Sequence, residues 1–491
     1  MWVGLGKGGG GQSHTQLDGF KTRVLRAGVS EQQRHLYMTA WRSVSTSTVP
    51  PMAVLVLTQR ASLLPHQSVA QQRTATPLPA VVMATALQQH TMEVHVLCAL
   101  EVAVSLTQAQ AANCQLLAVH LLTLGAQLPR SGFASSQHSA SWGLARSVRA
   151  EAQLPVVCID ASLEVALEHL PAPAEPEAVM RLEGQLVSRL VVARGIPPPP
   201  ITSAVGISGT HLVTGGTGGL GMLTARWLAQ AGASALALAS RGGALAPDSA
   251  AEWAQLHATG AVALVERCDT AEDVHVQRLV AVARQPEPMG MWHSAGVLAD
   301  GLLPNQKAAS LTRVYAPKAY GAGLLQAAAG MAPLRTCVLF SSVAALLGGA
   351  GQSNYSAANS ALDAHAPWRH ANGRACVSVQ WGAWAQVGMA SRGAASERMA
   401  AMEAASGFGR IAPAQGLAAL GTATLSMAPS LLGVMPVQWG RVLGDGTNVP
   451  AFLSGMTPLS SSGPTMQRMQ VARRGAISGM VLAEQPVMWC S

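Results

Sequence analysis

A serine, a tyrosine and an asparagine along one stretch of the chain are the residues whose types and order indicate chemistry. Ser342 precedes Tyr355, and Asn359 lies one helical turn after Tyr355, so the last two share one helix face. Reduction of a carbonyl group needs one donor that polarises the oxygen and another that delivers a proton as hydride arrives. A hydroxyl and a phenol that converge on one carbonyl oxygen meet both needs. The spacing therefore favours reduction of a carbonyl group.

The phenol needs a neighbouring cation, because its ordinary pKa near 10 is too high for proton transfer near neutral pH. A nearby Lys would favour the phenolate, and Lys318, which follows Pro317, is the upstream candidate. Each residue alone has an ordinary structural explanation. Ser342 would cap a helix, Tyr355 would fill a core and Lys318 would be a solvated surface charge. Only the set together indicates chemistry.

A glycine-rich turn lies between a predicted strand and a predicted helix, and its residues are Thr214, Gly215, Gly216, Thr217, Gly218, Gly219, Leu220 and Gly221. Glycines let the backbone turn tightly and approach a pyrophosphate, whose charge is stabilised at the helix N-terminus. In a chain with 49 glycines such a turn is weak evidence by itself. This one matches both GxGxxG and TGxxxGxG in a strand–turn–helix setting, which predicts dinucleotide binding.

The end of the next predicted strand indicates which dinucleotide is bound. An acidic residue there would hold the ribose diol of NAD, but the sequence has Ser240 and Arg241. Arg241 offers a cation to the extra phosphate of NADP. Asp269, after the following strand, is placed to accept a hydrogen bond from the adenine amine. The cofactor we expect is NADPH.

The elements that position these residues alternate between short apolar strands and helices. Strands are predicted at residues 211–214, 235–239, 261–266, 289–293, 336–340 and 375–380, with a first helix at 222–231. Strands that alternate with helices form a parallel sheet covered on both faces. The fold class expected is α/β, a Rossmann-like doubly wound parallel sheet.

Composition shifts suggest the domain boundaries. We expect a flexible tail at 1–34, a structural subdomain at 35–200, a catalytic subdomain at 201–445 and a C-terminal tail at 446–491. The proline run 197–200 favours an extended linker between the two subdomains. In the first subdomain the apolar run 52–57 and residues 155–159 are predicted strands, and 141–148 is a predicted helix.

Overall composition excludes several classes of protein. Hydrophobic residues make up 49% of the chain and charged residues 11%, so most of it should fold. The net charge is +8, but the basic residues are scattered, which argues against nucleic acid and suits an anionic cofactor or carrier. The seven cysteines show no metal-ligand spacing. Their odd number and dispersed positions predict reduced thiols, and so a location in the cytoplasm or a plastid stroma. The uncharged stretches 102–128 and 411–440 are interrupted by polar residues or prolines, so no membrane span is expected.

The chain resembles a known family, the ketoreductase domains of modular type I polyketide synthases and fatty acid synthases, within the short-chain dehydrogenase/reductase superfamily. The resemblance rests on Pro317-Lys318 and on residues 293–301, 340–342, 351–359, 362–364 and 381–389. In that family a Lys and an Asn exchange places relative to ordinary short-chain reductases, which matches Lys318 and Asn359.

The resemblance implies a role for each site residue. Tyr355 becomes the proton donor and Ser342 the hydrogen-bond partner of the carbonyl. Lys318 becomes the cation that tunes the tyrosine and binds ribose, and Asn359 completes a polar relay. Gly296, in the loop 293–301, joins the cofactor-binding set.

The resemblance also implies an N-terminal subdomain that is a truncated Rossmann-like unit without cofactor, supported by residues 36–41, 142–146 and 182–185. The sequence departs from the family pattern at three places. The apolar strand expected between Gln127 and Ser141 is missing, Gly242 replaces a second Arg, and Pro367 should kink the helix that carries Tyr355.

The function implied is NADPH-dependent reduction of a β-ketoacyl thioester to the β-hydroxyacyl thioester, with the acyl chain on the phosphopantetheine arm of an acyl carrier protein. Other synthase domains are further expected partners. Two alternatives remain: a catalytically silent structural module of a synthase, and a free-standing reductase of small carbonyl compounds. The intact set of Ser342, Tyr355, Lys318 and Asn359 disfavours the first, and the Lys/Asn exchange disfavours the second.

Four residues are candidates for controlling substrate entry and stereochemistry, namely Asp300, Leu347, Trp384 and Met389. In the family, an Asp at the place of Asp300 accompanies a D-configured hydroxyl. A Trp at the place of Leu347 accompanies the opposite outcome. The sequence therefore predicts the D product.

Overall fold

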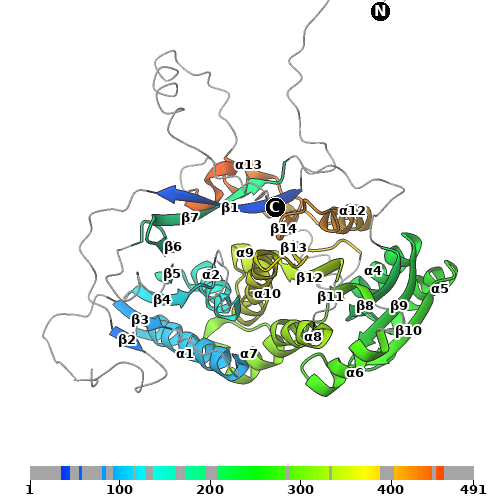
Figure 1. Ribbon diagram of the computed structural model, residues 1–491. Coiled ribbons are helices and arrows are strands. Elements are labelled where there is room, and N and C mark those ends of the chain that lie inside the picture. Colours follow the sequence, from blue (N-terminus) through cyan, green and yellow to red (C-terminus); the bar gives the residue numbers. More distant parts are fainter. Residues whose placement is uncertain are drawn as a thin grey trace, which may run out of the picture.

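The computed structural model describes residues 35–44, 55–57, 80–84, 92–113, 118–127, 136–161, 165, 173–194, 207–283, 288–330, 334–386, 403–444 and 449–457. These residues build one continuous sheet of 14 strands with helices packed on it (Figure 1). The proposed tail 1–34 and the linker prolines 197–200 lie outside the described residues.

The catalytic half is a parallel sheet in the order β10-β9-β8-β11-β12-β13-β14. Its strands are β8 (Gly209–Thr214), β9 (Ala233–Ser240), β10 (Val262–Arg267), β11 (Pro288–His293), β12 (Thr336–Ser342), β13 (Val377–Trp381) and β14 (Leu431–Val434). Each strand predicted for this half is confirmed within a few residues. Strand order reverses between β8 and β11, which creates the crevice where doubly wound sheets bind ligands. The predicted Rossmann-like fold class is confirmed.

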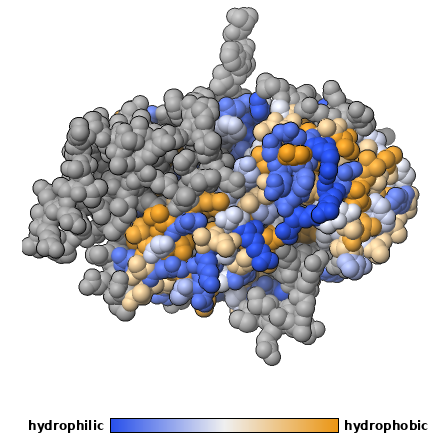
Figure 2. All heavy atoms as spheres, turned by 90° about the horizontal axis from the view of Figure 1, so that it is seen from below, coloured by the Kyte–Doolittle hydropathy of each residue, from blue (hydrophilic) through white to orange (hydrophobic). Residues whose placement is uncertain are grey.

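Helices cover both faces of this half. They are α4 (Gly219–Gln230), α5 (Ala250–His257), α6 (Asp273–Ala283), α7 (Ala308–Tyr315), α8 (Gly321–Ala329), α9 (Val343–Leu347), α10 (Ser353–Ala371), α12 (Pro413–Ala423) and α13 (Trp439–Val442). Helix α10 continues through Pro367 to Ala371, so the turn that carries Tyr355 is intact. Exposed apolar side chains occur on β10 and α6, on the side of the molecule where Figure 2 shows apolar surface.

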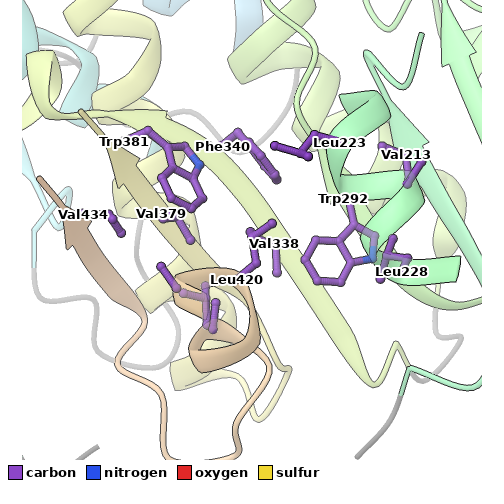
Figure 3. Packing of buried hydrophobic residues seen from close by; sticks show 14 of the residues in the cluster. Val213, Leu223, Leu228, Trp292, Val338, Phe340, Val379, Trp381, Leu420 and Val434 are labelled. Atoms are coloured by element: carbon purple, nitrogen blue, oxygen red, sulfur yellow. The ribbon is translucent and has the colours of Figure 1, made fainter. Parts of the chain in front are cut away.

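The main core lies where apolar strand residues meet α4 and α12. Trp292 of β11 packs near Leu228 of α4, and Trp381 of β13 lies beside Phe340 of β12, with Leu420 of α12 facing the same sheet (Figure 3). Burying a side chain of this size contributes about 1.5–3 kcal/mol. This core fixes the strands whose carboxyl ends carry the site.

The N-terminal half adds strands in the order β1-β7-β6-β5-β4-β3-β2. They are β1 (Leu36–Val44), β2 (Leu55–Leu57), β3 (Ala80–Ala84), β4 (Ala118–Leu124), β5 (Val156–Ala161), β6 (Glu177–Arg181) and β7 (Gly184–Val192), with helices α1 (Met92–Asn113) and α2 (Ala140–Ala152). Of the predicted strand 52–57, only Leu55–Leu57 is described, and the predicted strand at 155–159 corresponds to β5. The family pattern places an apolar strand between Gln127 and Ser141. In the structure the corresponding strand is β4, which ends before that interval, and the interval contains a 3-10 turn, Ser136–Ser139.

Several contacts join the halves, and two of them bring whole elements together. Strand β1 lies between β14 and β7, with Leu36 opposite Val434. Helix α2 packs along α10 so closely that a Cβ at Gly143 would lie 2.2 Å from the main-chain oxygen of Ser356 (Figure 1). The segment 446–491 also contains order, because the 3-10 helix Ala451–Met456 packs against β7. No described helix is long and apolar enough to cross a membrane.

Candidate active site

The glycine-rich turn lies at the crevice between β8 and β11. Gly215 has a φ of +68°, and a Cβ there would lie 2.9 Å from the main chain of Ser294. A Cβ at Gly221 would lie 2.1 Å from the main-chain oxygen of Gly215. The first turn of α4 therefore packs directly on the turn, and its free N–H groups are available to an anion.

Thr217 of the turn is held by the segment that follows β9. The main-chain oxygen of Thr217 accepts hydrogen bonds from Ala246 N at 3.3 Å and from Ser249 Oγ at 3.1 Å. Gly218 caps α4, with Met222 N donating to its oxygen at 2.7 Å. These contacts fix the backbone that would face a pyrophosphate.

A buried histidine links the turn to the lysine, and sequence reasoning did not single it out. His293, at the end of β11, is fully buried, with Nδ1 2.8 Å from Thr214 Oγ1 and Nε2 2.8 Å from the main-chain oxygen of Lys318. Burial lowers the pKa of His293 to about 4, so the ring is neutral. It then donates through Nε2 to the carbonyl and accepts from Thr214. The only sequence signal was its place in the family-like loop 293–301.

Lys318 lies on a single π-turn, Ala316–Tyr320, a geometry frequent at functional sites. It is 3% exposed, and Nζ donates to the main-chain oxygen of Phe340 at 2.7 Å. Burial lowers its pKa to about 8, although the negative charge of Asp363 acts in the opposite direction. Gly296 leaves room for the side chain, because a Cβ there would lie 3.5 Å from Nζ. Lys318 is thus buried rather than solvated.

Tyr355 lies beside this cation, with Lys318 Nζ 5.7 Å from the centre of its ring. Burial raises the pKa of Tyr355, and the neighbouring Asn359 and Ser342 side chains lower it. Ser342 does cap α9, since its Oγ accepts from Ala344 N at 3.2 Å, and this leaves its hydroxyl proton free to donate. The structure therefore brings Ser342, Tyr355 and Lys318 together.

Asn359 completes the group. Its Nδ2 donates to the main-chain oxygen of Tyr355 at 2.9 Å. Its Oδ1 is buried and meets no hydrogen-bond donor among the described residues. A buried acceptor without a partner is costly, so this oxygen is suited to a bound water or ligand.

Residues expected to select the cofactor follow the adjacent strands β9 and β10, on the same edge of the sheet as the turn. Ser240 Oγ accepts from Gly243 N at 3.2 Å, and Asp269 Oδ1 accepts from Ala271 N at 3.1 Å. Arg241 is exposed and forms no ion pair with any described residue. Nothing lies within 4 Å of a Cβ built at Gly242, so the surroundings of Arg241 are open.

The residues expected at the substrate entrance occupy different environments. Asp300 is exposed and its Oδ2 accepts from Gln352 Nε2 at 3.1 Å, while Leu347 ends α9 at the edge of a core cluster. Trp384 is 3% exposed and packs on Trp381, with ring centres 5.0 Å apart, so it belongs to the core rather than to an open groove. Met389 lies outside the described residues.

Comparisons with known proteins agree with this geometry. Residues 209–386 match the family model described as the KR domain. Polyketide synthase GfsB of Streptomyces halstedii is 42% identical over 236 residues, which are 48% of this chain and 4% of that synthase. GfsA of the same organism is 37% identical over 317 residues, 64% of this chain and 4% of that synthase. The chain spans only a small part of these relatives.

A solved structure described as an A-type ketoreductase from a modular polyketide synthase has a similar fold. The two chains superpose with a TM-score of 0.76 at 27% sequence identity, covering 88% of this chain and 100% of that one. The matched KR domain contains the glycine-rich turn and the group formed by Lys318, Ser342 and Tyr355. Residues 209–386 are therefore similar to the KR domains of polyketide synthases, and the fold is that of a modular polyketide synthase ketoreductase.

Proposed function

We propose that the chain reduces the β-keto group of a β-ketoacyl thioester to a β-hydroxyl group, with NADPH as the reductant. The observation that carries this proposal is the meeting of Lys318, Tyr355 and Ser342 beside the crevice between β8 and β11. The acyl chain arrives on the phosphopantetheine arm of an acyl carrier protein, alongside other synthase domains, in the cytoplasm or a plastid stroma.

Each side chain has a distinct task. Ser342 Oγ donates to the carbonyl oxygen of the substrate and orients it. Tyr355 gives its phenolic proton to that oxygen as the negative charge develops. Lys318 favours the phenolate left behind, and His293 fixes the backbone of Lys318. Asn359 Oδ1 offers an acceptor for a water that returns the proton.

The residues present fit NADPH. The open backbone of the glycine-rich turn and the N-terminus of α4 suit a pyrophosphate. Arg241 suits the extra phosphate, Asp269 the adenine, and Lys318 with Gly296 the nicotinamide ribose. When bound, the cofactor supplies the hydride. We also propose that the D-configured product forms, because Asp300 stands on the loop that flanks the entrance.

The direct test is oxidation of NADPH by the purified chain in the presence of a simple β-ketoacyl thioester of pantetheine. We expect thioester-dependent loss of NADPH absorbance and appearance of the β-hydroxyacyl product. A chain that binds NADPH but turns over no β-ketoacyl thioester would instead be a silent structural module. Turnover of small ketones without turnover of thioesters would indicate a free-standing reductase.

Arg241→Ala is expected to weaken NADPH binding by about tenfold or more, the scale of a charge-assisted contact with phosphate, and to leave NADH binding unchanged. The measurement is the dissociation constant for each cofactor by fluorescence titration. Arg313→Ala, at an exposed position on α7, is the matched control. Equal affinity of the unmodified protein for NADPH and NADH would contradict the proposed contact between Arg241 and the extra phosphate.

Turnover is expected to fall as pH rises through about 8, the lowered pKa of Lys318. Below that pH the ammonium is charged and favours the phenolate. Above it the charge is lost, and Tyr355 becomes a weaker acid. A pH–rate profile with saturating substrates measures this. The Lys318→Arg variant stays charged over this range, so the turnover that it retains should not decline at alkaline pH. A decline with the same midpoint as in the unmodified chain would contradict the role of Lys318.

A further inference from the structure

Glu151, in the last turn of α2, reaches from the N-terminal half into the catalytic half. Its Oε1 accepts from Leu303 N at 2.6 Å, and its Oε2 accepts from Gly351 N at 2.8 Å. Both oxygens of one carboxylate are thus used by main-chain donors of two segments that are far apart in sequence. Hydrogen bonds of this charge-assisted kind are stronger than neutral ones.

The two segments flank the candidate site. The first is the loop after β11, here named the β11 loop (residues 294–306), which carries Gly296 and Asp300. The second is the turn before α10, here named the α10 turn (residues 348–352), which leads directly into Tyr355. Both segments therefore lie next to residues of the candidate site in the sequence.

These segments also touch each other at the same place. Gly301 N donates to the main-chain oxygen of Gly351 at 2.8 Å, beside the bond between Gln352 and Asp300. Glu151 therefore closes a ring of contacts in which the N-terminal half sets the distance between the β11 loop and the α10 turn. Gln108 of α1 supports the far end of the loop, with Nε2 donating to the main-chain oxygens of Leu303 at 2.8 Å and Gln306 at 3.0 Å.

The sequence position of Glu151 is unfavourable for α2 itself. A carboxylate in the last turn of a helix faces the negative end of the helix dipole, where a cation is favoured. The same helix directs Arg146 and Ser147 at the catalytic half, since Arg146 Nη1 donates to the oxygen of Ala345 at 2.6 Å and Ser147 Oγ accepts from Gly349 N at 3.2 Å. One face of α2 is thus built to hold the segment between Ser342 and Tyr355.

We infer that Glu151 is a positioning residue that fixes the β11 loop against the α10 turn and thereby determines how the pantetheine arm of the substrate enters. This inference rests on the proposed reduction of a β-ketoacyl thioester. It assigns to the N-terminal half a task in substrate selection that it performs without touching the reacting atoms.

The first arm of the test does not depend on activity. Amide hydrogen exchange is compared between the unmodified chain and Glu151→Gln, which keeps the size of the side chain but replaces one acceptor oxygen by a donor. Glu272→Gln, at an exposed position on the catalytic half, is the matched control. Exchange should become at least about fivefold faster in the β11 loop and the α10 turn, the scale of one lost charge-assisted hydrogen bond, and stay unchanged at residues 214–221. Unchanged exchange in both segments would overturn the inference.

The second arm measures the consequence for the substrate. In Glu151→Gln, KM for a β-ketoacyl pantetheine thioester should rise at least about fivefold and the proportion of the D product should fall. Turnover of a small ketone without the arm, and affinity for NADPH, should stay within about twofold of the control. Equal losses with both substrates would show general damage and refute a role in entry. If the unmodified chain reduces no thioester, the proposed function fails, while the exchange arm still decides whether Glu151 positions the segments.

Discussion

Tyr355→Phe is expected to lower turnover of a β-ketoacyl thioester at least ~10²-fold while NADPH affinity stays within about twofold, because in the proposed mechanism the phenol supplies the proton and takes no part in holding the cofactor phosphates. Steady-state kinetics gives the first value and fluorescence titration the second. The substitution removes one oxygen from a half-buried ring, so the packing of Tyr355 against the neighbouring core is retained.

Tyr37→Phe is the matched control, because it removes the same atom from a buried ring on β1, where Tyr37 Oη accepts from Trp439 Nε1 at 3.0 Å. That variant should lose some stability and keep its turnover. If Tyr355→Phe turns over as fast as the unmodified chain, another group delivers the proton. If Tyr355→Phe also loses affinity for NADPH, the phenol contributes to cofactor binding as well as to proton transfer.

The second large effect is expected from Gly143→Ala. The added Cβ would lie 2.2 Å from the main-chain oxygen of Ser356 and 2.8 Å from Cβ of Ser360, so α2 and α10 must move apart. Overpacking of this kind costs about 1–3 kcal/mol, and the clash with rigid main chain places it at the upper end. Because Ser356 adjoins Tyr355, turnover should fall together with the free energy of unfolding.

Denaturant unfolding and steady-state kinetics of the same preparation measure both effects. Gly323→Ala is the control, since Gly323 lies inside α8 with nothing within 4 Å of the added Cβ. Replacement of such a helical glycine should stabilise the protein by about 0.5–1 kcal/mol. A Gly143→Ala variant that is as stable and as active as the control would show that the close packing of α2 on α10 does not stabilise the site.

Local patterns were sufficient to predict six strands of the catalytic half, from β8 to β13, but not β14. Apolar runs bounded by glycines gave these strands, and the turn at 214–221 stands between a strand and a helix, as its spacing required. The one-turn spacing of Tyr355 and Asn359 likewise depends only on helix geometry. Such features are encoded within a few residues of one another, so a single sequence reveals them.

Features that depend on packing between distant segments could not be predicted. His293 contacts the carboxyl end of β8 and the π-turn, two segments that no spacing rule connects. Lys318 was expected either as a surface charge or as a site cation, and only its bond to Phe340 places it inside the fold. Trp384 lies in the core because Gly416 of α12 leaves space for its ring. Strand β4 lies upstream of the interval in which the family pattern predicts a strand, so the pattern alone does not locate it.

The pairing of β1 with both β14 and β7 has a consequence for biosynthesis. One edge of β1 can pair with β7 as soon as residues 184–192 have left the ribosome, whereas its other edge waits for residues 431–434. At about 5–20 residues per second, that wait is on the order of ten to fifty seconds. During it, β1 presents unpaired main-chain groups of the kind that attract strands from other chains. Pairing with β14, the last described strand in sequence, therefore also protects the free edge of β1 from pairing with other chains.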